Sequence, residues 1–365
     1  MIASSRVMRG GVESGMRSLR SLRHSSSPTR QLPRIRALHN NTAISNQKED
    51  LQHAIHTVKA HDPAGNLPGR LLPDPAMKTA YYAVRSFWVE TGLRFGSTAA
   101  VPPNATPIKH LEWWQAGINF LFENNAVLSP DTEQPIRDLY CQHPTLRLLQ
   151  SLLQQDTQWT KQHFDDVLSG RRKDLDVKQY ETLAELVKHA GQSCGSLSQL
   201  VLESGNIMST DHPASHEAAR LVGICHGLTN ALRTSIPVIS TTGKLIVPAE
   251  LCVKYGVKSP RYLLSALGMG DDVCVRALQN AVEDIANEAR QHLQAARDLR
   301  PDILAEPQGA KAVSVLLPAL ASETFLNRLQ EFNHQLTDRN LRNVGRLEHA
   351  VCAGRMVVAH YRKTY

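Results

Sequence analysis

The sequence predicts an all-α fold, and two observations support this prediction. Apolar residues recur at helical spacing through most of residues 41–365. No stretch of those residues sustains the alternation of apolar and polar side chains, rich in β-branched and aromatic residues, that is typical of strands. We therefore expect a single bundle of roughly ten helices, a type of fold in which ligand sites often lie between the helices.

The first half of the predicted bundle contains two well-marked helices and one long apolar stripe. Met77–Leu93 and His110–Glu123 each place apolar residues on one face, and residues 97–107 between them carry the proline and asparagine of a connector. The long stripe covers Tyr180–Glu203. Two shorter helices are expected between these segments, at Leu146–Leu153 and Trp159–Leu168.

The second half begins at Pro213, which suits a first helical turn because its missing N–H costs nothing there. Asp211 or His212 is expected to cap this helix, which should run through Leu232. Lys244–Val247 is expected to pair briefly as a hairpin. The remaining predicted helices are Ser259–Leu267, Asp272–Leu299, Lys311–Glu331 and Leu341–Tyr361.

The net charge of +7 comes from the N-terminal segment. Residues 1–40 hold eight of the 41 basic residues, all arginines, and one of the 34 acidic residues, so 33 of each remain in residues 41–365. The body therefore has no overall attraction for nucleic acid, and we expect no nucleic-acid partner. An arginine- and serine-rich start with almost no acids is typical of a mitochondrial or plastid transit peptide, although a basic disordered tail has a similar composition.

The six cysteines are scattered and form no CxxC pair. This pattern predicts free, mostly buried thiols in a reducing compartment, not a disulfide framework or a zinc site. The sequence also has no P-loop and no GxGxxG motif, and we expect neither a cofactor nor a metal ion.

Three short patterns imitate functional motifs. Residues 191–195 match GxSxG, but they lie inside a helical stripe, so we interpret the small residues as a close helix crossing and not as a nucleophile elbow. His212 and His216 share a helix face without the glutamate of a zinc protease motif, which favours capping and packing roles. Asp271 and Asp272 precede a helix and are expected to cap it.

Eight segments in order resemble the squalene/phytoene synthase family. They are LLP with AYYAVRSFWVE (71–73 and 80–90), HLEWWQAGI (110–118), HPTLRLL (143–149), LSGRRKDLDVKQYETLAEL (168–186), HAGQSCGSL (189–197), GLTNALR (227–233), GKLIVP (243–248) and VLLPALASETFLNRL (315–329). The resemblance covers residues 61–335 and implies an isoprenoid-synthase-like bundle with a central cavity. Residues 41–60 are then a linker or first helix, and 336–365 a C-terminal amphipathic helix and tail.

The resemblance also implies that two aspartate-rich motifs should hold Mg²⁺ against a diphosphate. Carboxylates are needed because Mg²⁺ prefers oxygen ligands and neutralises the charge of the leaving group. In this sequence the first motif falls at about Gly92, Leu93 and Gly96, where Glu90 is the only nearby acid. The second motif falls at Thr234 and Val238. We therefore expect no diphosphate chemistry by this mechanism and assign no catalytic residue.

A family member that lacks these motif aspartates resembles the assembly factor 6 group, whose members assemble mitochondrial respiratory complex I. Residues 211–224, 247–257 and 362–365 also agree with that group. The resemblance implies a non-catalytic factor on the matrix side of the inner membrane, which acts early on a membrane-arm subunit and has complex I subunits or intermediates as partners. The alternatives are a prenyl-diphosphate transferase and a prenyl-lipid-binding protein.

Two expectations concern contacts with ligands and membranes. Glu90, Asn230 and Arg233 are candidate pocket-lining residues, for a lipid, a quinone or an apolar client segment; the alternative is that they satisfy one another as a buried polar cluster. The C-terminal helix carries an apolar stripe that either docks peripherally on the membrane or a partner, or packs against the body. The stripe consists of Leu341, Val344, Leu347, Val351, Val358 and Tyr361.

Overall fold

The computed structural model describes residues 32–72, 74–92, 106–123, 142–342 and 346–365, without the side chains of 32–45, 339, 342, 346 and 347. The chain divides into two units, Met1–Ile44 and Ser45–Tyr365. The described part of the first unit is helical from Leu32. All side-chain contacts below belong to the second unit.

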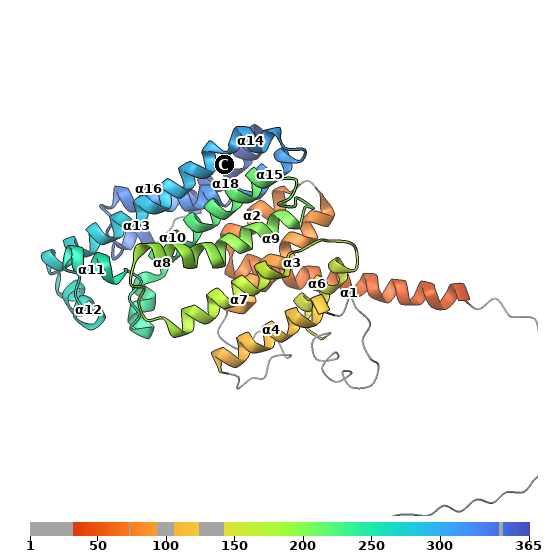
Figure 1. The fold of residues 1–365 in the computed structure, drawn as a ribbon, viewed down its shortest axis with the longest axis horizontal. Helices are drawn as coiled ribbons and strands as arrows, with labels where there is room; N and C mark the ends of the chain where they lie inside the picture. Colours follow the sequence, from red (N-terminus) through yellow and green to blue (C-terminus); the bar gives the residue numbers. More distant parts are fainter. Residues whose placement is uncertain (1–31, 73, 93–105, 124–141, 343–345) are drawn as a thin grey trace, which may run out of the picture. The chain divides into compact units, whose positions relative to one another are not determined.

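Helices make up most of the described ranges, which contain no strand, so the predicted all-α class is confirmed (Figure 1). Prolines at or next to the first position start many of them, as expected from the fixed backbone angle of proline. The elements are α1 (Leu32–His61), α2 (Pro63–Leu71), α3 (Pro75–Gly92), α4 (Pro107–Glu123), α6 (Pro144–Leu153), α7 (Lys161–Asp176), α8 (Leu183–Ala190), a π-helix (Gly191–Gly195), α9 (Ser196–Glu203), α10 (Pro213–Thr242), α11 (Ala249–Tyr255), α12 (Pro260–Met269), α13 (Asp272–Asp298), α14 (Arg300–Ala305), α15 (Gly309–Val315), α16 (Ala319–Glu331), α17 (Arg339–Arg342) and α18 (Arg346–Arg362).

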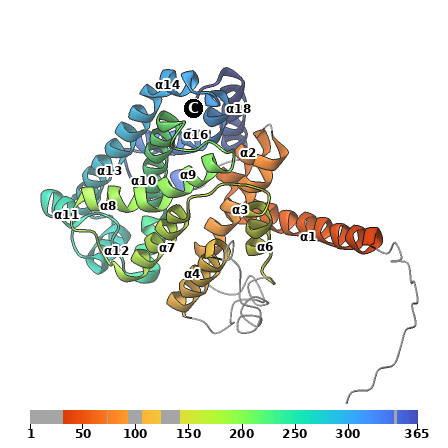
Figure 2. The same ribbon diagram turned by 45° about the vertical axis from the view of Figure 1, so that its right-hand side comes forward.

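Helix α10 is the central element of the second unit (Figure 2). It packs against α8, the π-helix and α9, and also against α13 and α16. Its side chains are buried over most of its first twenty residues. The helix continues beyond the predicted end at Leu232, through Pro237, and stops at Gly243, whose φ of +70° is the left-handed conformation that glycine adopts readily.

The start of α10 is capped from a distant segment. His212 occupies the N-cap position but makes no side-chain cap, so the prediction that Asp211 or His212 caps the helix is wrong. Instead, the Glu306 carboxylate accepts the backbone N–H of Ala214 at 2.7 Å and contacts the Ser215 hydroxyl. A carboxylate at this end also complements the helix dipole.

The predicted continuous helix Tyr180–Glu203 is divided into α8, a π-helical turn and α9. Helix α8 begins at Leu183, where the Thr182 hydroxyl accepts the N–H of Glu185 at 3.2 Å. The π-helix coincides with the GxSxG stretch, and here α10 crosses very closely. A Cβ on Gly223 of α10 would lie 2.5 Å from the carbonyl oxygen of Cys194. This confirms the interpretation of the small residues as a close helix crossing.

The hairpin expected at Lys244–Val247 does not form, because residues 243–248 contain no strand. This segment runs along the connector before α8: Leu245 donates its N–H to the carbonyl of Lys178 at 3.1 Å, and Ala249 donates to that of Tyr180 at 2.9 Å. The local pairing is therefore with residues distant in sequence.

Helix α18 packs through a face other than the predicted stripe. Met356 and Ala359 are buried with Leu317 and Leu320, and Cys352 packs against them. Of the predicted stripe, Leu341 is buried, whereas Val351, Val358 and Tyr361 are exposed; the side chains of Val344 and Leu347 lie outside the described residues. The exposed part of the stripe is not accounted for by packing against the body.

Among the described residues, no single helix has the length and apolar character to cross a membrane. One bent pair, Gly309–Val315 with Ala319–Glu331, meets those criteria by length and composition when its two helices are taken together across a 45° bend. Many of its apolar side chains, such as Val313, Leu326 and Leu329, are buried in the bundle.

Candidate functional site

The positions of the second aspartate motif lie on the C-terminal half of α10. The Thr234 hydroxyl donates to the carbonyl of Asn230, one turn earlier, at 2.8 Å. Val238 is partly buried and has no atom that can bind a metal ion. A neutral hydroxyl that already donates to its own helix is a poor replacement for a carboxylate ligand of Mg²⁺.

An arginine lies beside the first motif. A Cβ on Gly92, the last residue of α3, would lie 2.9 Å from Nη2 of Arg171. The Arg171 guanidinium lies 3.8 Å from the ring centroid of Trp88 and donates to the Trp88 carbonyl at 3.2 Å. Leu93 and Gly96 lie outside the described residues. A carboxylate at position 92 would therefore meet a positive charge and pair with it, in competition with any metal ion.

Asn230 and Arg233 belong to one polar cluster between α10 and α16. The Nδ2 atom of Asn230 lies 3.0 Å from Nε2 of His226, and Arg233 donates to Oδ1 of Asn230 at 3.5 Å. The other ring nitrogen of His226 lies 3.3 Å from the Ser322 hydroxyl. The Arg233 guanidinium lies 5.0 Å from the ring centroid of Phe325. Asn230 and Arg233 therefore contact each other, but Arg233 is exposed and Glu90 is not part of the cluster. A pocket-lining role for Asn230 and Arg233 stays a prediction.

A buried ion pair adjoins this cluster. Arg85 is 5% exposed and pairs with Asp62, which also caps α2 by accepting the N–H of Gly65 at 3.0 Å. The Tyr81 hydroxyl donates to the carbonyl of Gly65 at 2.6 Å, which joins α3 to α2. Burial, together with the charge of Arg85, lowers the pKa of His226 to about 4. The His226 ring is therefore neutral at physiological pH.

Glu90, which we expected near Asn230, contacts histidines instead. One carboxylate oxygen lies 2.7 Å from Nε2 of His53 and the other 3.4 Å from Nε2 of His143. The backbone carbonyl of Glu90 lies 3.1 Å from Nε2 of His110. Glu90 therefore joins α1, α4 and the start of α6 to α3. In the described part of the chain, no three His, Cys, Asp or Glu side chains are arranged to hold a metal ion.

The pKa values of the two histidines at Glu90 are shifted in opposite directions. The hydrogen bond to Glu90 raises the pKa of His53, because the carboxylate favours the protonated ring. Burial lowers the pKa of His143 to about 4, and this effect outweighs the attraction of Glu90. His143 is 1% exposed and His53 is 28% exposed, which explains the difference.

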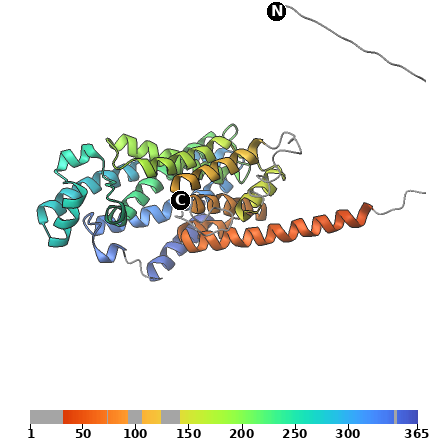
Figure 3. The same cartoon turned by 90° about the horizontal axis from the view of Figure 1, so that it is seen from below.

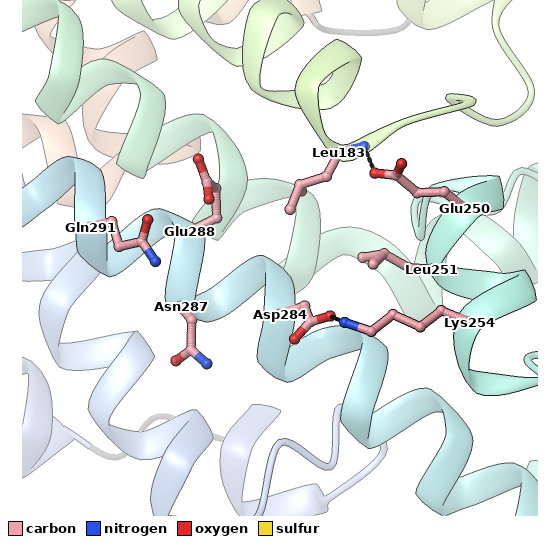
Figure 4. Close-up of a pocket in the computed structure, with 8 residues that line it drawn as sticks. All are labelled: Leu183, Glu250, Leu251, Lys254, Asp284, Asn287, Glu288 and Gln291. Atoms are coloured by element: carbon pink, nitrogen blue, oxygen red, sulfur yellow. Dashed lines mark hydrogen bonds and ion pairs between the residues drawn. The ribbon is translucent and has the colours of Figure 1, made fainter.

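A hollow of about 540 Å³ lies at another place, between the start of α8, α11 and α13 (Figure 4). Glu250 accepts the N–H of Leu183 on one side, and Lys254 pairs with Asp284 at 2.8 Å on the other. None of the predicted pocket-lining residues borders this hollow. The central cavity implied by the family resemblance stays a prediction.

The imitations of functional motifs have structural roles. Ser193 of the π-helix donates its hydroxyl to the carbonyl of His189, near the end of α8, at 2.9 Å. The His216 ring lies 2.7 Å from the carbonyl of Ile207, and the His212 ring lies 3.3 Å from that of Met208. Asp271 caps α13 by accepting the N–H groups of the residues two and three positions later. The capping role predicted for Asp271 and the packing roles of the histidines are confirmed.

The sulfur chemistry also agrees with the sequence. The five cysteines in the described residues are free thiols, and Cys194, Cys225 and Cys274 are buried. Cys141 lies outside the described residues. Burial raises the pKa of Cys194 to about 11 and that of Cys225 to about 12, so neither is a reactive thiolate.

Relatives of this chain share one name. The protein called NADH dehydrogenase (ubiquinone) complex I, assembly factor 6, is 24% identical in Bos taurus, over 78% of this chain and 75% of that protein. In Homo sapiens it is 23% identical over 86% of this chain and 82% of that protein. The Dictyostelium discoideum homolog is 26% identical over 77% and 70%.

Two solved structures of related enzymes share the fold of this chain. A dehydrosqualene synthase superposes with a TM-score of 0.64 at 18% identity, over 88% of this chain and all of that chain. Squalene synthase HpnC from Alicyclobacillus acidocaldarius superposes with a TM-score of 0.59 at 14% identity, over 80% and 99%. The family profile described as squalene/phytoene synthase matches residues 58–348. Because this match spans most of the sequence, the chain belongs to the squalene/phytoene synthase family.

Proposed function

We propose that this protein is a non-catalytic assembly factor of mitochondrial complex I, acting early on a membrane-arm subunit at the matrix side of the inner membrane. The observation that carries the proposal is the shared name of its relatives from mammals and Dictyostelium, which match most of its length. The arginine-rich first 40 residues support import into mitochondria.

The eroded metal site supports the absence of catalysis. Ionisation of a prenyl diphosphate needs Mg²⁺ to neutralise the leaving group, and the metal needs several carboxylate oxygens. At the motif positions, Thr234 and Val238 supply none, and Gly92 faces the guanidinium of Arg171. The polar interior around Arg85 and His226 is held by its own hydrogen bonds and ion pair.

The assembly role is tested by deleting the gene and measuring complex I on native gels. We expect loss of the assembled complex and of its NADH oxidation, while the other respiratory complexes remain. Re-expression of the full chain should restore both. Normal complex I in the deleted cells would remove the proposal.

The absence of catalysis has a separate test. Purified protein with Mg²⁺ and farnesyl or geranylgeranyl diphosphate is expected to release no diphosphate above the no-protein background, and Mg²⁺ is expected to leave its melting temperature unchanged. An active dehydrosqualene synthase, assayed in parallel, is the positive control. Mg²⁺-dependent release of diphosphate would show that the chain is an enzyme, whatever its role in assembly.

A further inference from the structure

The segment from α11 to the start of α13 exposes large apolar side chains at an unusual density. Val253, Tyr262, Met269 and Val273 are 84%, 51%, 77% and 72% exposed, and they fall within 21 consecutive residues. Single exposed apolar residues are ordinary, but a group of them usually marks an interaction surface. Helices α11 and α12 lie together at the same end of the bundle in each view, beside the start of α13 (Figure 3).

The exposed side chains on α12 share one face. Tyr262 and Met269 are seven residues apart, two helical turns, and therefore lie on the same side of α12. The small side chain of Ala266, one turn from each of them, is buried, as is Leu263. Val273 follows Met269 after a turn that Gly270 makes possible with its φ of +73°. A Cβ on Gly268 or Gly270 would meet no atom within 4 Å, so the surrounding surface is open.

Cations that form no ion pair border these apolar residues. In the second unit as described, Lys258 and Arg261 are exposed without an acidic partner, and the Arg276 guanidinium donates only to the backbone carbonyl of Asp272 at 3.3 Å. The nearby acids are mostly engaged: Glu250 binds the N–H of Leu183, and Asp271 caps α13. Asp271 and Asp272, at the start of α13, offset part of the charge of the three cations, but neither forms an ion pair with them in the described residues.

Helix α18 offers the natural comparison, because Val351, Val358 and Tyr361 are 56%, 50% and 77% exposed. Of the described cations of α18, Arg355 is paired with Glu323, whereas Arg362 is exposed and forms no ion pair. The apolar content of the two surfaces is similar, but the surface around α12 has three such exposed cations, Lys258, Arg261 and Arg276.

We propose that the surface formed by Val253, Lys258, Arg261, Tyr262, Met269 and Val273, the α12 surface, docks on a bilayer that contains anionic phospholipid. The apolar side chains enter the boundary between headgroups and acyl chains, and the cations contact the lipid phosphates. The free positive charges favour an anionic bilayer over an apolar protein groove as the occupant. The inference rests on the proposed function only in naming the inner membrane as the surface concerned.

The first test measures insertion at single positions. The full chain carrying Met269→Cys or Val358→Cys is labelled with an environment-sensitive fluorophore and mixed with vesicles of phosphatidylcholine, alone or with phosphatidylglycerol. We expect a severalfold rise in emission for the label at 269 with the anionic vesicles, and little change for the label at 358. The unsubstituted chain measures labelling of its own cysteines. This readout reports depth at the label, so the N-terminal arginines do not produce it.

The second test removes the contacts. Lys258→Glu with Arg261→Glu is expected to weaken binding to the anionic vesicles by about thirtyfold, because each basic residue near such a surface contributes roughly a fivefold factor. Met269→Ser with Val273→Ser should weaken it about tenfold. Val351→Ser with Val358→Ser is the matched control on α18 and should bind as the unsubstituted chain does.

Insertion at 358 with none at 269, or α12 variants that bind as tightly as the unsubstituted chain, would overturn the proposal. The proposal would also be overturned if the α12 surface bound a single mitochondrial protein but neither kind of vesicle. The assembly proposal is tested independently. If the chain fails these vesicle tests but restores complex I in deleted cells, membrane docking by the α12 surface is rejected and the assembly role stands.

Discussion

Replacing Gly223 with alanine should lower the free energy of unfolding by about 2 kcal/mol or more. A Cβ there would lie 2.5 Å from both the Cys194 carbonyl oxygen and the Gly195 Cα, and 2.6 Å from the Gly195 nitrogen. All three atoms belong to the backbone, so no side chain can rotate away, and α10 must separate from the π-helix. This overpacking outweighs the gain of about 1 kcal/mol that alanine gives over glycine inside a helix.

Gly268→Ala provides the matched control in the same bundle. It lies in α12, and a Cβ there would meet nothing within 4 Å. Alanine at 268 is therefore expected to be neutral or to stabilise the protein by up to about 1 kcal/mol. Chemical denaturation of both variants, followed by circular dichroism, measures the difference. If the two variants unfold at the same denaturant concentration, the crossing at Gly223 is looser than the structure indicates.

The sequence predicted the residues on one side of this helix crossing but not their partner on the other side. The small residues of 189–197 and their helical surroundings predicted a close approach, which the structure confirms. Their partner, Gly223, lies far along the chain, and the register between two helices depends on all the side chains that pack around them. For the same reason the π-helical turn within the stripe could not be predicted from periodicity.

Short and proline-containing helices escaped the sequence analysis. Helix α2 holds Pro68 and two glycines within nine residues, a composition that favours a loop. Its formation depends on tertiary contacts, since Asp62 caps it and pairs with Arg85 of α3, and the hydroxyl of Tyr81 binds its backbone. The predicted linker or first helix at 41–60 falls within α1.

Some features of the candidate site could likewise be predicted from the sequence, and others required the structure. The lack of carboxylates at Gly92, Thr234 and Val238 follows from residue identity and needs no structure. The presence of Arg171 against Gly92 required the fold, because the two residues belong to helices α3 and α7. The environment of Glu90 was also out of reach, since His53 and His143 come from segments 37 and 53 positions away.

The protein is expected to lose stability steeply in mild acid, and two buried histidines dominate the loss. Burial lowers the pKa of both His143 and His226 to about 4, against an ordinary value of 6.5. Below pH 6.5 the two rings are protonated in the unfolded chain but stay neutral in the folded protein. Protons therefore favour the unfolded state, and the free energy of unfolding decreases as the pH falls towards 4. Between about pH 7 and pH 5 each ring should remove roughly 2 kcal/mol, and the pair about 4 kcal/mol.

Burial sets the sign of both contributions, and the charged neighbours of the two rings change only their size. His143 faces Glu90, whose attraction opposes the effect of burial on its pKa, and Arg147 and the His53 ring, which add to that effect. His226 faces Arg85 and Arg233, which reinforce its burial, and Asp62, which opposes it. His53 acts in the other direction: its pKa is raised, so the stability that it gains from Glu90 is fully present below pH 6.5 and is lost as the pH rises through its folded value.

Denaturation of three variants over this pH range isolates the effect. His143→Gln and His226→Gln remove the titrating ring and keep a polar side chain, so each should flatten the pH dependence by about 2 kcal/mol, whatever it does to stability at pH 7. His349→Gln, at an exposed position of α18, is the control and should leave the dependence unchanged. Because the readout is a difference between two pH values, packing losses cancel. A pH dependence that both buried-site variants leave intact would mean that these rings protonate freely in the folded protein and that water reaches the interior beside Arg85 and Glu90.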